Sequence, residues 1–408
     1  MHNEDYADKT HKRHHADNTQ MRHSVSEREL QFHDISIAKL LRIAVEDKSI
    51  ISLGPGEPDF AMSPVLQKHL GTLKKYNHYS PPGGRHELKE AIAKKLFREN
   101  KIKCAPENIV VTCGSQEALT IGIAATCDAT ENILIPEPSF FAYLSTAELF
   151  DAVPVSVSSC EDNGWQIDAD EIEKSITEKT EALIINSPCN PTGAVYTKKI
   201  LEEIADVAVE HDLYVFSDEA YEKIIYGKKH ISMGSFNGMH DYVITLQTFS
   251  KSHAMAGFRV GYCCAPLELA NAMKKTQVFT TISAPTVSQM LALKALQSGN
   301  AYTKKMVDEY KKRRNFTVKR LNELGLQTQM PDGTFYAFAN IQAYNKGRKT
   351  HSASRDFAEM LLKKAKVACV PGIDFGVHGE GYVRFSYATD MGKIKTAMDR
   401  IEKAIKGL

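Results

Sequence analysis

The stretch ALIINSPCNPTGAVYTKKILEEIADVAVEHDLYVFSDE, residues 182–219, carries the pattern that decides the fold. It opens and closes with the short apolar runs ALIINSP and LYVFSDE, which are typical of strands buried on both faces. Between these runs, TKKILEEIADVAVEHD has a helical pattern. The order strand, helix, strand predicts two strands of a mainly parallel sheet with a helix packed against it.

The same alternation continues on both sides of this stretch. Four more apolar runs, NIVVTC, NILIP, YVITLQ and RVGYCC, are expected to be buried strands, and GSQEALTIGIAATC is a further helical stretch. We therefore predict an α/β architecture in which helices cover a mainly parallel sheet.

A second, smaller domain is expected because 408 residues exceed what one ordinary core organises. The segment AYTKKMVDEYKKRRNFTVKRLNEL predicts a linking helix, and TFYAFANI, VACVPG and GYVRFSYA after it predict strands of an α+β domain. The predicted boundaries are a polar tail at 1–22, an N-terminal segment at 23–70 that joins the small domain, a large domain at 71–300 and a small C-terminal domain at 301–408.

Composition excludes several classes of partner. The 51 basic and 50 acidic residues nearly cancel, so neither nucleic acid nor an anionic membrane is an expected partner. No apolar run approaches the roughly 20 residues that cross a bilayer, and the N-terminus has no apolar signal core. The eight cysteines lack the repeated Cys-x-x-Cys spacing of a zinc site, and most lie in apolar segments, so we expect reduced, structural thiols and a cytoplasmic protein.

The first 22 residues are polar, almost free of aliphatic side chains and rich in histidine. Such a segment cannot bury enough apolar surface to offset the entropy of ordering it, so we expect a disordered tail. Metal binding by His11, His14 and His15 is the alternative, although short histidine-rich tracts are a weak signal.

Residues near the ends of the predicted strands suggest a ligand, because open α/β sheets bind ligands beyond the carboxyl ends of their strands. Lys251 is unusual among them, since it lies between small and apolar residues where an ammonium group is uncommon. Together these side chains can bind a phosphate, an aromatic ring, a ring nitrogen, a phenolic oxygen and an aldehyde. That set of groups describes pyridoxal phosphate. The residues are Gly114, Ser115, Gln116, Phe140, Asn190, Asp218, Tyr221, Thr248, Lys251 and Arg259.

From about Ile51 to the C-terminus, the chain resembles the class I/II aminotransferases of the fold-type I pyridoxal-phosphate superfamily. Its pattern is most similar to the aspartate and aromatic broad-range subgroup. The resemblance implies a large domain with a seven-stranded, mainly parallel sheet. The motifs that carry it, in the family order, are LGPGEPDF, YSPPGGRHELKEAI, VTCGSQEAL, EPSFFAY, NSPCNPTG, SDEAY, TFSKSHAMAGFRVGY and VRFSYA.

The resemblance implies a role for each residue around the cofactor ring. Lys251 would form the Schiff base and act as the general base and acid, and Asp218 would keep the pyridine nitrogen protonated. Tyr221 and Asn190 would hydrogen-bond the phenolic oxygen, and Phe140 would stack on the ring. Without the other motifs, each of these residues has an ordinary structural explanation. Asp218 could be a helix N-cap, Asn190 could belong to a turn, and Phe140 could be a core residue.

Four residues would hold the phosphate, and the resemblance extends to a second subunit. Ser115 and Gln116 open a helix directly after a strand, where free N–H groups attract an anion, while Thr248 would add a hydroxyl and Arg259 a charge. Tyr79 matches a tyrosine that family members donate across a subunit boundary. A homodimer with shared active sites is therefore expected.

The substrate side is set by Arg384, which matches the arginine that grips an α-carboxylate, together with Gly56 and Asn190. These residues imply an L-amino acid and a 2-oxo acid that exchange an amino group by a ping-pong mechanism. QVFTTISAPTVSQ and Gln116 lack the added cation of strict dicarboxylate enzymes. We therefore expect an aromatic or broad-range donor.

Three other activities remain open at this point. An aspartate- or alanine-type aminotransferase would use the same cofactor residues. A carbon–sulfur lyase on the same scaffold would differ only in how the reaction partitions. The aminotransferase-like sensor of a transcription regulator is the non-enzymatic alternative, but the short polar segment ahead of the resemblance is too small for a winged helix-turn-helix module.

Overall fold

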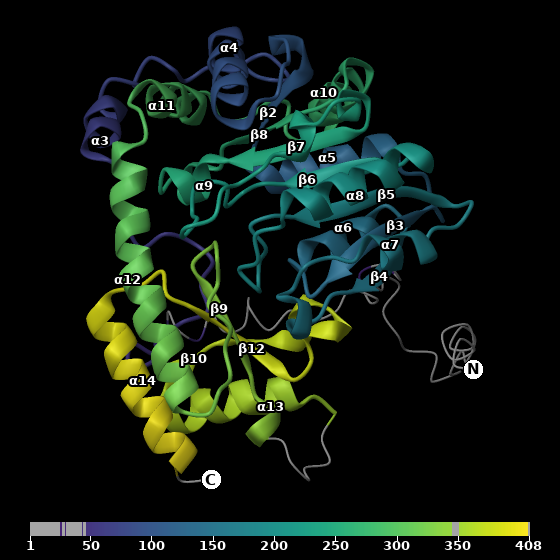
Figure 1. Ribbon diagram of the computed structural model, residues 1–408. Coiled ribbons are helices and arrows are strands. Elements are labelled where there is room, and N and C mark those ends of the chain that lie inside the picture. Colours follow the sequence, from purple (N-terminus) through teal and green to yellow (C-terminus); the bar gives the residue numbers. More distant parts are fainter. Residues whose placement is uncertain (1–24, 27–28, 30–42, 44–45, 345–350, 407–408) are drawn as a thin grey trace, which may run out of the picture. The chain divides into compact units, whose positions relative to one another are not determined.

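The computed structural model of the chain describes residues 25–26, 29, 43, 46–344 and 351–406 (Figure 1). The histidine-rich tail at 1–22, with its expected disorder and its candidate metal ligands, lies outside the described residues. The described residues from 43 onward belong to one unit that comprises residues 35–408.

The largest sheet has seven strands in the order β2-β8-β7-β6-β5-β3-β4 (Figure 1). Neighbours among β3 to β7 run parallel, and β8 is antiparallel to both β2 and β7. Every residue of β2, β7 and β8 is buried, as their continuous apolar runs predict. The expected fold class is confirmed. The strands are β2 (Ile109–Thr112), β3 (Asn132–Glu137), β4 (Val153–Ser158), β5 (Thr180–Asn186), β6 (Tyr214–Asp218), β7 (Val243–Thr248) and β8 (Gly261–Cys264).

Alternate residues of each buried strand face two different layers of helices. On β5, Leu183 and Ile185 pack in one apolar cluster with side chains of α7 and α8. Ala182 and Ile184 point the other way, into a cluster with α5, α6 and α10. A sheet covered on both faces explains why these strands contain so few polar residues. The helices are α5 (Ser115–Thr126), α6 (Ala142–Leu149), α7 (Ala169–Lys174), α8 (Lys198–Glu210) and α10 (Leu267–Thr280).

One strand of this sheet was not predicted from the sequence. Strand β4 lies at the edge, next to β3, and its sequence VPVSVS alternates apolar and small polar residues. Only Val157 of β4 is buried, so the strand lacks the continuous apolar run that marks the others.

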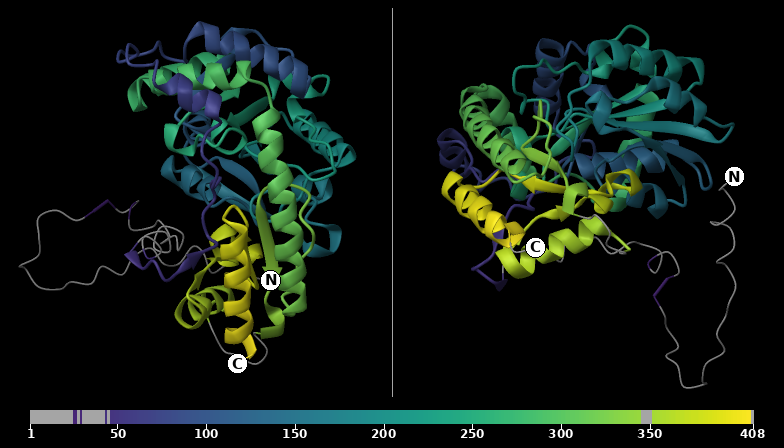
Figure 2. Two further views of the ribbon diagram at one scale, coloured as in Figure 1. Left: turned by 90° about the vertical axis from the view of Figure 1, so that its left-hand side faces the viewer. Right: turned by 60° about the horizontal axis from the view of Figure 1, so that its bottom comes forward.

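The C-terminal part of the chain contains a separate three-stranded antiparallel sheet in the order β11-β12-β9. Predicted as one strand, VACVPG forms two, because β10 pairs with the N-terminal strand β1 while β11 pairs with β12. The predicted linking helix is α12, which lies beside α14 (Figures 1 and 2). These elements are β1 (Ile51–Ser52), β9 (Tyr336–Asn340), β10 (Val367–Ala368), β11 (Val370–Pro371), β12 (Tyr382–Ser386), α12 (Ala301–Glu323), α13 (Ala353–Met360) and α14 (Met391–Lys406).

Within the described residues, the remaining α-helices are α3 (Pro64–Leu70), α4 (His86–Lys95), α9 (Phe249–Ser252) and α11 (Thr286–Gln297). Among the residues that the structure describes, none of the helices has both the length and the apolar character needed to cross a membrane. All eight cysteines carry free thiols.

Candidate active site

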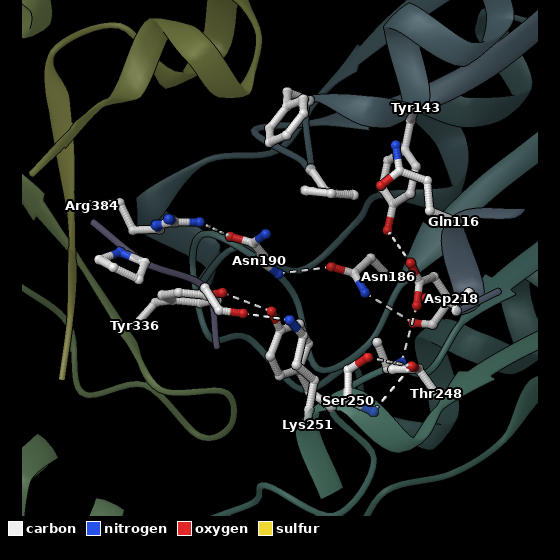
Figure 3. Close-up of a pocket in the computed structure, with 18 of the residues that line it drawn as sticks. Gln116, Tyr143, Asn186, Asn190, Asp218, Thr248, Ser250, Lys251, Tyr336 and Arg384 are labelled. Carbon is white, nitrogen blue, oxygen red and sulfur yellow. Dashed lines mark hydrogen bonds between the residues drawn. The ribbon is translucent and has the colours of Figure 1, made fainter. Parts of the chain in front are cut away.

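A cavity of about 250 Å³ lies at the carboxyl ends of β5, β6 and β7 (Figure 3). Arg384 reaches it from β12, and the segment after β1 forms another part of its wall. Tyr79, which is 80 % exposed, is the predicted site residue that does not line it. The predicted residues that do are Gly56, Ser115, Gln116, Phe140, Asn190, Asp218, Tyr221, Thr248, Lys251, Arg259 and Arg384.

Lys251 lies on α9, a short helix that begins directly after β7. The side chain of Thr248 caps this helix by accepting from the Ser250 N–H at 3.2 Å, which fixes the turn that directs the lysine. The ammonium group donates to the carbonyl of Gly56 (Figure 3). Burial lowers the pKa of Lys251 to about 8, and the positive charges of Arg384 and Arg259 act in the same direction. The amine is therefore partly neutral near pH 7.

Asp218 ends strand β6 and is 7 % exposed. Tyr143 donates its hydroxyl to one carboxylate oxygen at 2.8 Å, and the N–H of Ala220 donates to the other at 3.0 Å. Burial raises the pKa of Asp218, and the hydrogen bond from Tyr143 opposes that rise. Both donors are neutral, so the carboxylate suits a cationic group in the cavity.

The N-terminus of α5 and Arg259 form an anion-binding corner of the cavity. Gly114 precedes α5 with φ of +85°, and no side chain caps the first turn. A Cβ on Gly114 would lie 2.9 Å from Arg259 Nη2, so a glycine lets the guanidinium approach this turn. Thr248 and Ser250 line the same cavity, with their hydroxyl oxygens 2.9 Å apart. Free N–H groups, two hydroxyls and an arginine together fit a phosphate.

Arg384 is 1 % exposed, and both of the acceptors that it contacts are neutral. Nη1 donates to Asn190 Oδ1 at 2.8 Å (Figure 3), and Nη2 donates to the Gly54 carbonyl at 2.6 Å. Nε has no hydrogen-bond partner among the described residues. Burial lowers the pKa of Arg384. Because both acceptors are neutral and Arg384 lines the cavity, its guanidinium suits an anionic ligand such as a carboxylate there.

Tyr221 and Tyr336 line the cavity near Lys251. Their hydroxyl oxygens are 2.7 Å apart, and either phenol can be the donor. The Lys251 Nζ lies 5.9 Å from the centre of the Tyr221 ring. Phe140 also lines the cavity, with its ring edge-on to that of Tyr143 at 5.6 Å between centroids.

Several residues that line the cavity were not predicted. Tyr143 and Tyr336 are the most informative, because each hydroxyl contacts a predicted site residue. Tyr143 lies three residues after Phe140 in EPSFFAY, a spacing that places both side chains on one side of a helical turn, and this signal could have identified it. Gly114, one of the strand-end residues expected from the sequence, lines the cavity as well. The additional lining residues are Gly54, Pro55, Phe141, Tyr143, Asn186, Ala220, Ser250 and Tyr336.

A cluster of ionisable groups lies close to this site in the chain but does not line the cavity. Glu219, Glu222 and His230 bring potential ligand atoms together, and Lys95 forms an ion pair with Glu222. Burial alone would raise the pKa of Glu222, but the charges of Lys95 and Lys223 lower it to about 2. Lys95 thus supplies a positive charge to the cluster, and we interpret the cluster as a buried ionic network.

The buried Asp218 carboxylate, the anion-binding corner, the lysine with a lowered pKa and the Arg384 guanidinium all line one cavity (Figure 3). These groups complement a phosphorylated, nitrogen-containing ring with an aldehyde, plus a carboxylate beside it. The donor set therefore fits pyridoxal phosphate together with an amino acid.

Comparisons with known proteins agree with this geometry. Residues 48–401 match the family model described as aminotransferase class I and II. The chain is 44 % identical to an aspartate aminotransferase of Pyrococcus abyssi and 43 % identical to an aromatic-amino-acid aminotransferase of Thermococcus litoralis. Both alignments cover 94 % of this chain and 98 % of the relative. Among solved structures, the aromatic aminotransferase of Pyrococcus horikoshii has a TM-score of 0.84 at 43 % identity, covering 91 % of this chain and 99 % of the other.

Proposed function

Because this chain belongs to the class I and II aminotransferase family, we propose which of its residues carry out the chemistry and which amino acids it accepts. It is a pyridoxal-phosphate-dependent enzyme that moves an amino group between an amino acid and a 2-oxo acid. Bound pyridoxal phosphate supplies an aldehyde that condenses with amines and a ring that withdraws electrons from the substrate's Cα. The observation that carries the assignment of residues is the convergence of Lys251, Asp218 and Arg384 on one cavity.

In this proposal, Lys251 is the catalytic base and acid. When its amine is free, Nζ removes the proton from the substrate's Cα and later returns it to the neighbouring reacting carbon. Asp218 holds a proton on the ring nitrogen, and its burial against Tyr143 supports this role. Tyr221 and Asn190 would hydrogen-bond the phenolic oxygen and Phe140 would stack on the ring, and all three line the cavity.

The substrate is held by its α-carboxylate. We assign this contact to Arg384 and to the backbone around Gly56, because both residues line the cavity and the two groups that accept from the guanidinium are neutral. Asn190 fixes the guanidinium by accepting from Nη1. The phosphate is assigned to the corner formed by Ser115, Gln116, Thr248 and Arg259.

The lowered pKa of Lys251 makes the rate of cofactor incorporation depend on pH. Only the neutral amine attacks an aldehyde, so we expect the rate constant for loading the apoprotein to rise about tenfold per pH unit below the pKa of about 8 and to level off above it. Stopped-flow absorbance across this range measures the effect. The control is Nα-acetyllysine, whose ordinary pKa of about 10.4 keeps its rate rising well above pH 8. A protein profile that matched the control would contradict the lowered pKa.

We propose a broad range of donors that includes aromatic amino acids. The three cations that line the cavity among the described residues, Lys251, Arg259 and Arg384, are each assigned to another group, and Gln116 is neutral. A distal carboxylate therefore finds no further cation, while Phe140 offers an apolar surface. Relatives named for aspartate and for aromatic amino acids match to a similar degree, which supports broad specificity.

The absorption spectrum of the purified protein tests this proposal. We expect tyrosine and phenylalanine to convert the bound cofactor to its amine form, and 2-oxoglutarate to restore the original band. Aspartate, alanine and cystathionine complete the panel. Conversion by aspartate alone would refute the aromatic preference. Pyruvate and ammonia from cystathionine would instead indicate a lyase, and failure to bind pyridoxal phosphate would refute the assigned site.

We also propose that the enzyme is a homodimer with shared active sites. Tyr79 is 80 % exposed and Phe279 is 81 % exposed, which is unusual for aromatic side chains in a monomer. Two hydrogen bonds of Thr286, to the hydroxyl of Ser80 and the carbonyl of His78, hold the Tyr79 segment against the start of α11. A second copy covering these side chains would bring Tyr79 to its partner's cavity.

Mixing two inactive variants tests the shared site. If Tyr79 acts in the partner's cavity, Tyr79→Ala and Lys251→Ala subunits should regain activity when refolded together, because a mixed dimer contains one site with both residues intact. Activity of the mixture is compared with that of each variant refolded alone. No recovery in mixtures shown by native mass spectrometry to contain heterodimers would mean that Tyr79 acts within its own subunit or not at all.

The domain boundaries and the location in the cell are proposals as well. Residues 71–300 contain the seven-stranded sheet, and 301–408 with 23–70 would form the smaller domain, which the pairing of β1 with β10 supports. Eight free thiols are consistent with a reducing compartment, and this supports a cytoplasmic enzyme.

A further inference from the structure

Tyr336 touches three parts of the active site that come from distant segments of the chain. It begins strand β9 and is 1 % exposed. Its hydroxyl oxygen lies 2.7 Å from that of Tyr221, and its ring lies 4.1 Å from the guanidinium carbon of Arg384 (Figure 3). A Cβ on Gly56 would come within 2.5 Å of the same hydroxyl, so the glycine segment packs directly against it. A residue with these contacts can influence both the cofactor side and the substrate side of the cavity.

The contact between the two hydroxyls limits where the proton of Tyr221 can point. Each phenol has one O–H donor, so only one of the two can donate across the 2.7 Å contact. If Tyr221 donated to Tyr336, its proton would point away from the phenolic oxygen assigned to it. If Tyr336 donates instead, Tyr221 keeps its proton for the cofactor. Accepting a hydrogen bond also makes Tyr221 a stronger donor, because bonds in a chain polarise one another.

The ring of Tyr336 has a separate contact with Arg384. The central carbon of the guanidinium lies 4.1 Å from the Tyr336 centroid and 4.8 Å from the Phe375 centroid. Contact with two aromatic rings restricts tilting of the planar group. Because Tyr336 and Arg384 both line the cavity, the Tyr336 ring can hold the guanidinium in position for a carboxylate bound there.

We propose that Tyr336 is a positioning residue with two separable functions. Its hydroxyl donates to Tyr221 and so directs the Tyr221 proton toward the cofactor's phenolic oxygen. Its ring holds the guanidinium plane of Arg384 for the substrate carboxylate. This inference rests on the proposed roles of Tyr221 and Arg384.

Two substitutions separate the functions. Tyr336→Phe removes the hydroxyl and keeps the ring, whereas Tyr336→Leu removes both. Tyr226→Phe is the matched control, because Tyr226 is also a buried phenol with an arginine guanidinium 4.5 Å from its ring centre and a bonded hydroxyl, but it does not line the cavity. The first readout is a pH titration of the absorption band of the bound cofactor. The second is the Kd of 3-phenylpropionate, an unreactive carboxylate, measured by calorimetry.

The two readouts should respond differently. A stronger hydrogen bond from Tyr221 stabilises the ionised phenolic oxygen and lowers the pH at which the bound cofactor loses its proton. Tyr336→Phe should therefore raise the titration midpoint by a few tenths of a unit to about one unit, and leave the Kd of the carboxylate within about twofold. Tyr336→Leu should show the same shift of the midpoint and raise the Kd of 3-phenylpropionate by about two- to thirtyfold. Tyr226→Phe should change neither value.

Each contrary result has a defined meaning. A midpoint in Tyr336→Phe equal to that of the wild type, or an equal shift in Tyr226→Phe, would overturn the role of the hydroxyl. Equal carboxylate affinity in Tyr336→Leu and Tyr336→Phe would overturn the role of the ring. Tyr336→Phe preserves the shape of the core, so the hydroxyl role is tested even if Tyr336→Leu does not fold. A wild-type protein that binds no pyridoxal phosphate would refute the proposed function itself, which distinguishes that failure from failure of this inference.

Discussion

The Lys251→Ala protein is expected to bind pyridoxal phosphate and yet turn over amino acids at least about 10⁴-fold more slowly than the wild type. The alanine removes the amine that bonds the cofactor and also the base that moves the proton at Cα, and base catalysis alone contributes up to about 10⁴-fold. Binding should persist because the groups around the phosphate and the ring nitrogen, such as Arg259 and Asp218, are unchanged. Single-turnover absorbance with tyrosine measures the rate.

Two further measurements make this prediction specific. After reduction with borohydride, mass spectrometry should find the cofactor attached to the peptide that contains Lys251 in the wild type and to no peptide in the variant. Lys251→Arg is the matched control, because it keeps a positive charge but offers no nucleophilic amine, and it should be as slow as alanine. Wild-type turnover in either variant would refute the assignment of Lys251.

Arg384→Lys is expected to lower kcat/KM for amino acids by about 10²- to 10³-fold. The lysine keeps the positive charge but lacks the planar guanidinium with its several N–H donors. It therefore cannot donate to the α-carboxylate and to the Asn190 side-chain carbonyl in the same geometry. Breaking a buried, hydrogen-bonded charge contact costs about 3–4 kcal/mol, which corresponds to this range of rate. Steady-state kinetics with tyrosine provides the measurement.

Tyramine distinguishes loss of carboxylate binding from general damage. It lacks the α-carboxylate, so its slow reaction should be nearly the same in the wild type and in Arg384→Lys, and the preference for tyrosine over tyramine should collapse. Arg314→Lys is the matched control, because Arg314 is also buried and contacts an aromatic ring but does not line the cavity. An equal decrease for both substrates in Arg384→Lys would show that the arginine acts only on stability.

The sequence predicted the elements whose signals are local. Strands β5 and β6 are recognisable from their apolar runs alone, because strands buried on both faces need no partner-specific pattern. Helix α8 is likewise recognisable from its own helical pattern. Edge strand β4 lacks that signal, since only Val157 is buried. The division of VACVPG into β10 and β11 depends on which distant strand each half pairs with, and no local pattern specifies that choice.

The same distinction applies to the site. Eleven residues to which the resemblance gives a role line the cavity. Nine of them lie near strand ends of the large sheet, where the topology brings them together, while Gly56 follows β1 and Arg384 lies within β12. Tyr336 was missed because its hydroxyl contact spans 115 positions in the chain, and TFYAFANI alone indicates only a buried strand. Tyr79 matches the motif but lies outside the cavity of its own chain, and its role depends on a second subunit that a single sequence cannot place.

The pairing of β1 with β10 has a consequence for how the cavity can close. Leu53 accepts a hydrogen bond from the Ser386 N–H at 2.6 Å, and the Gly54 carbonyl accepts from Arg384, so the glycine segment and the arginine belong to one hydrogen-bonded body. The Gly56 carbonyl of the same segment already accepts a hydrogen bond from Lys251, so any movement of this body would shift both sides of the carboxylate site relative to the lysine in a single step. Opening and closing of this side of the cavity would then need no independent lid, because both sides move as one part.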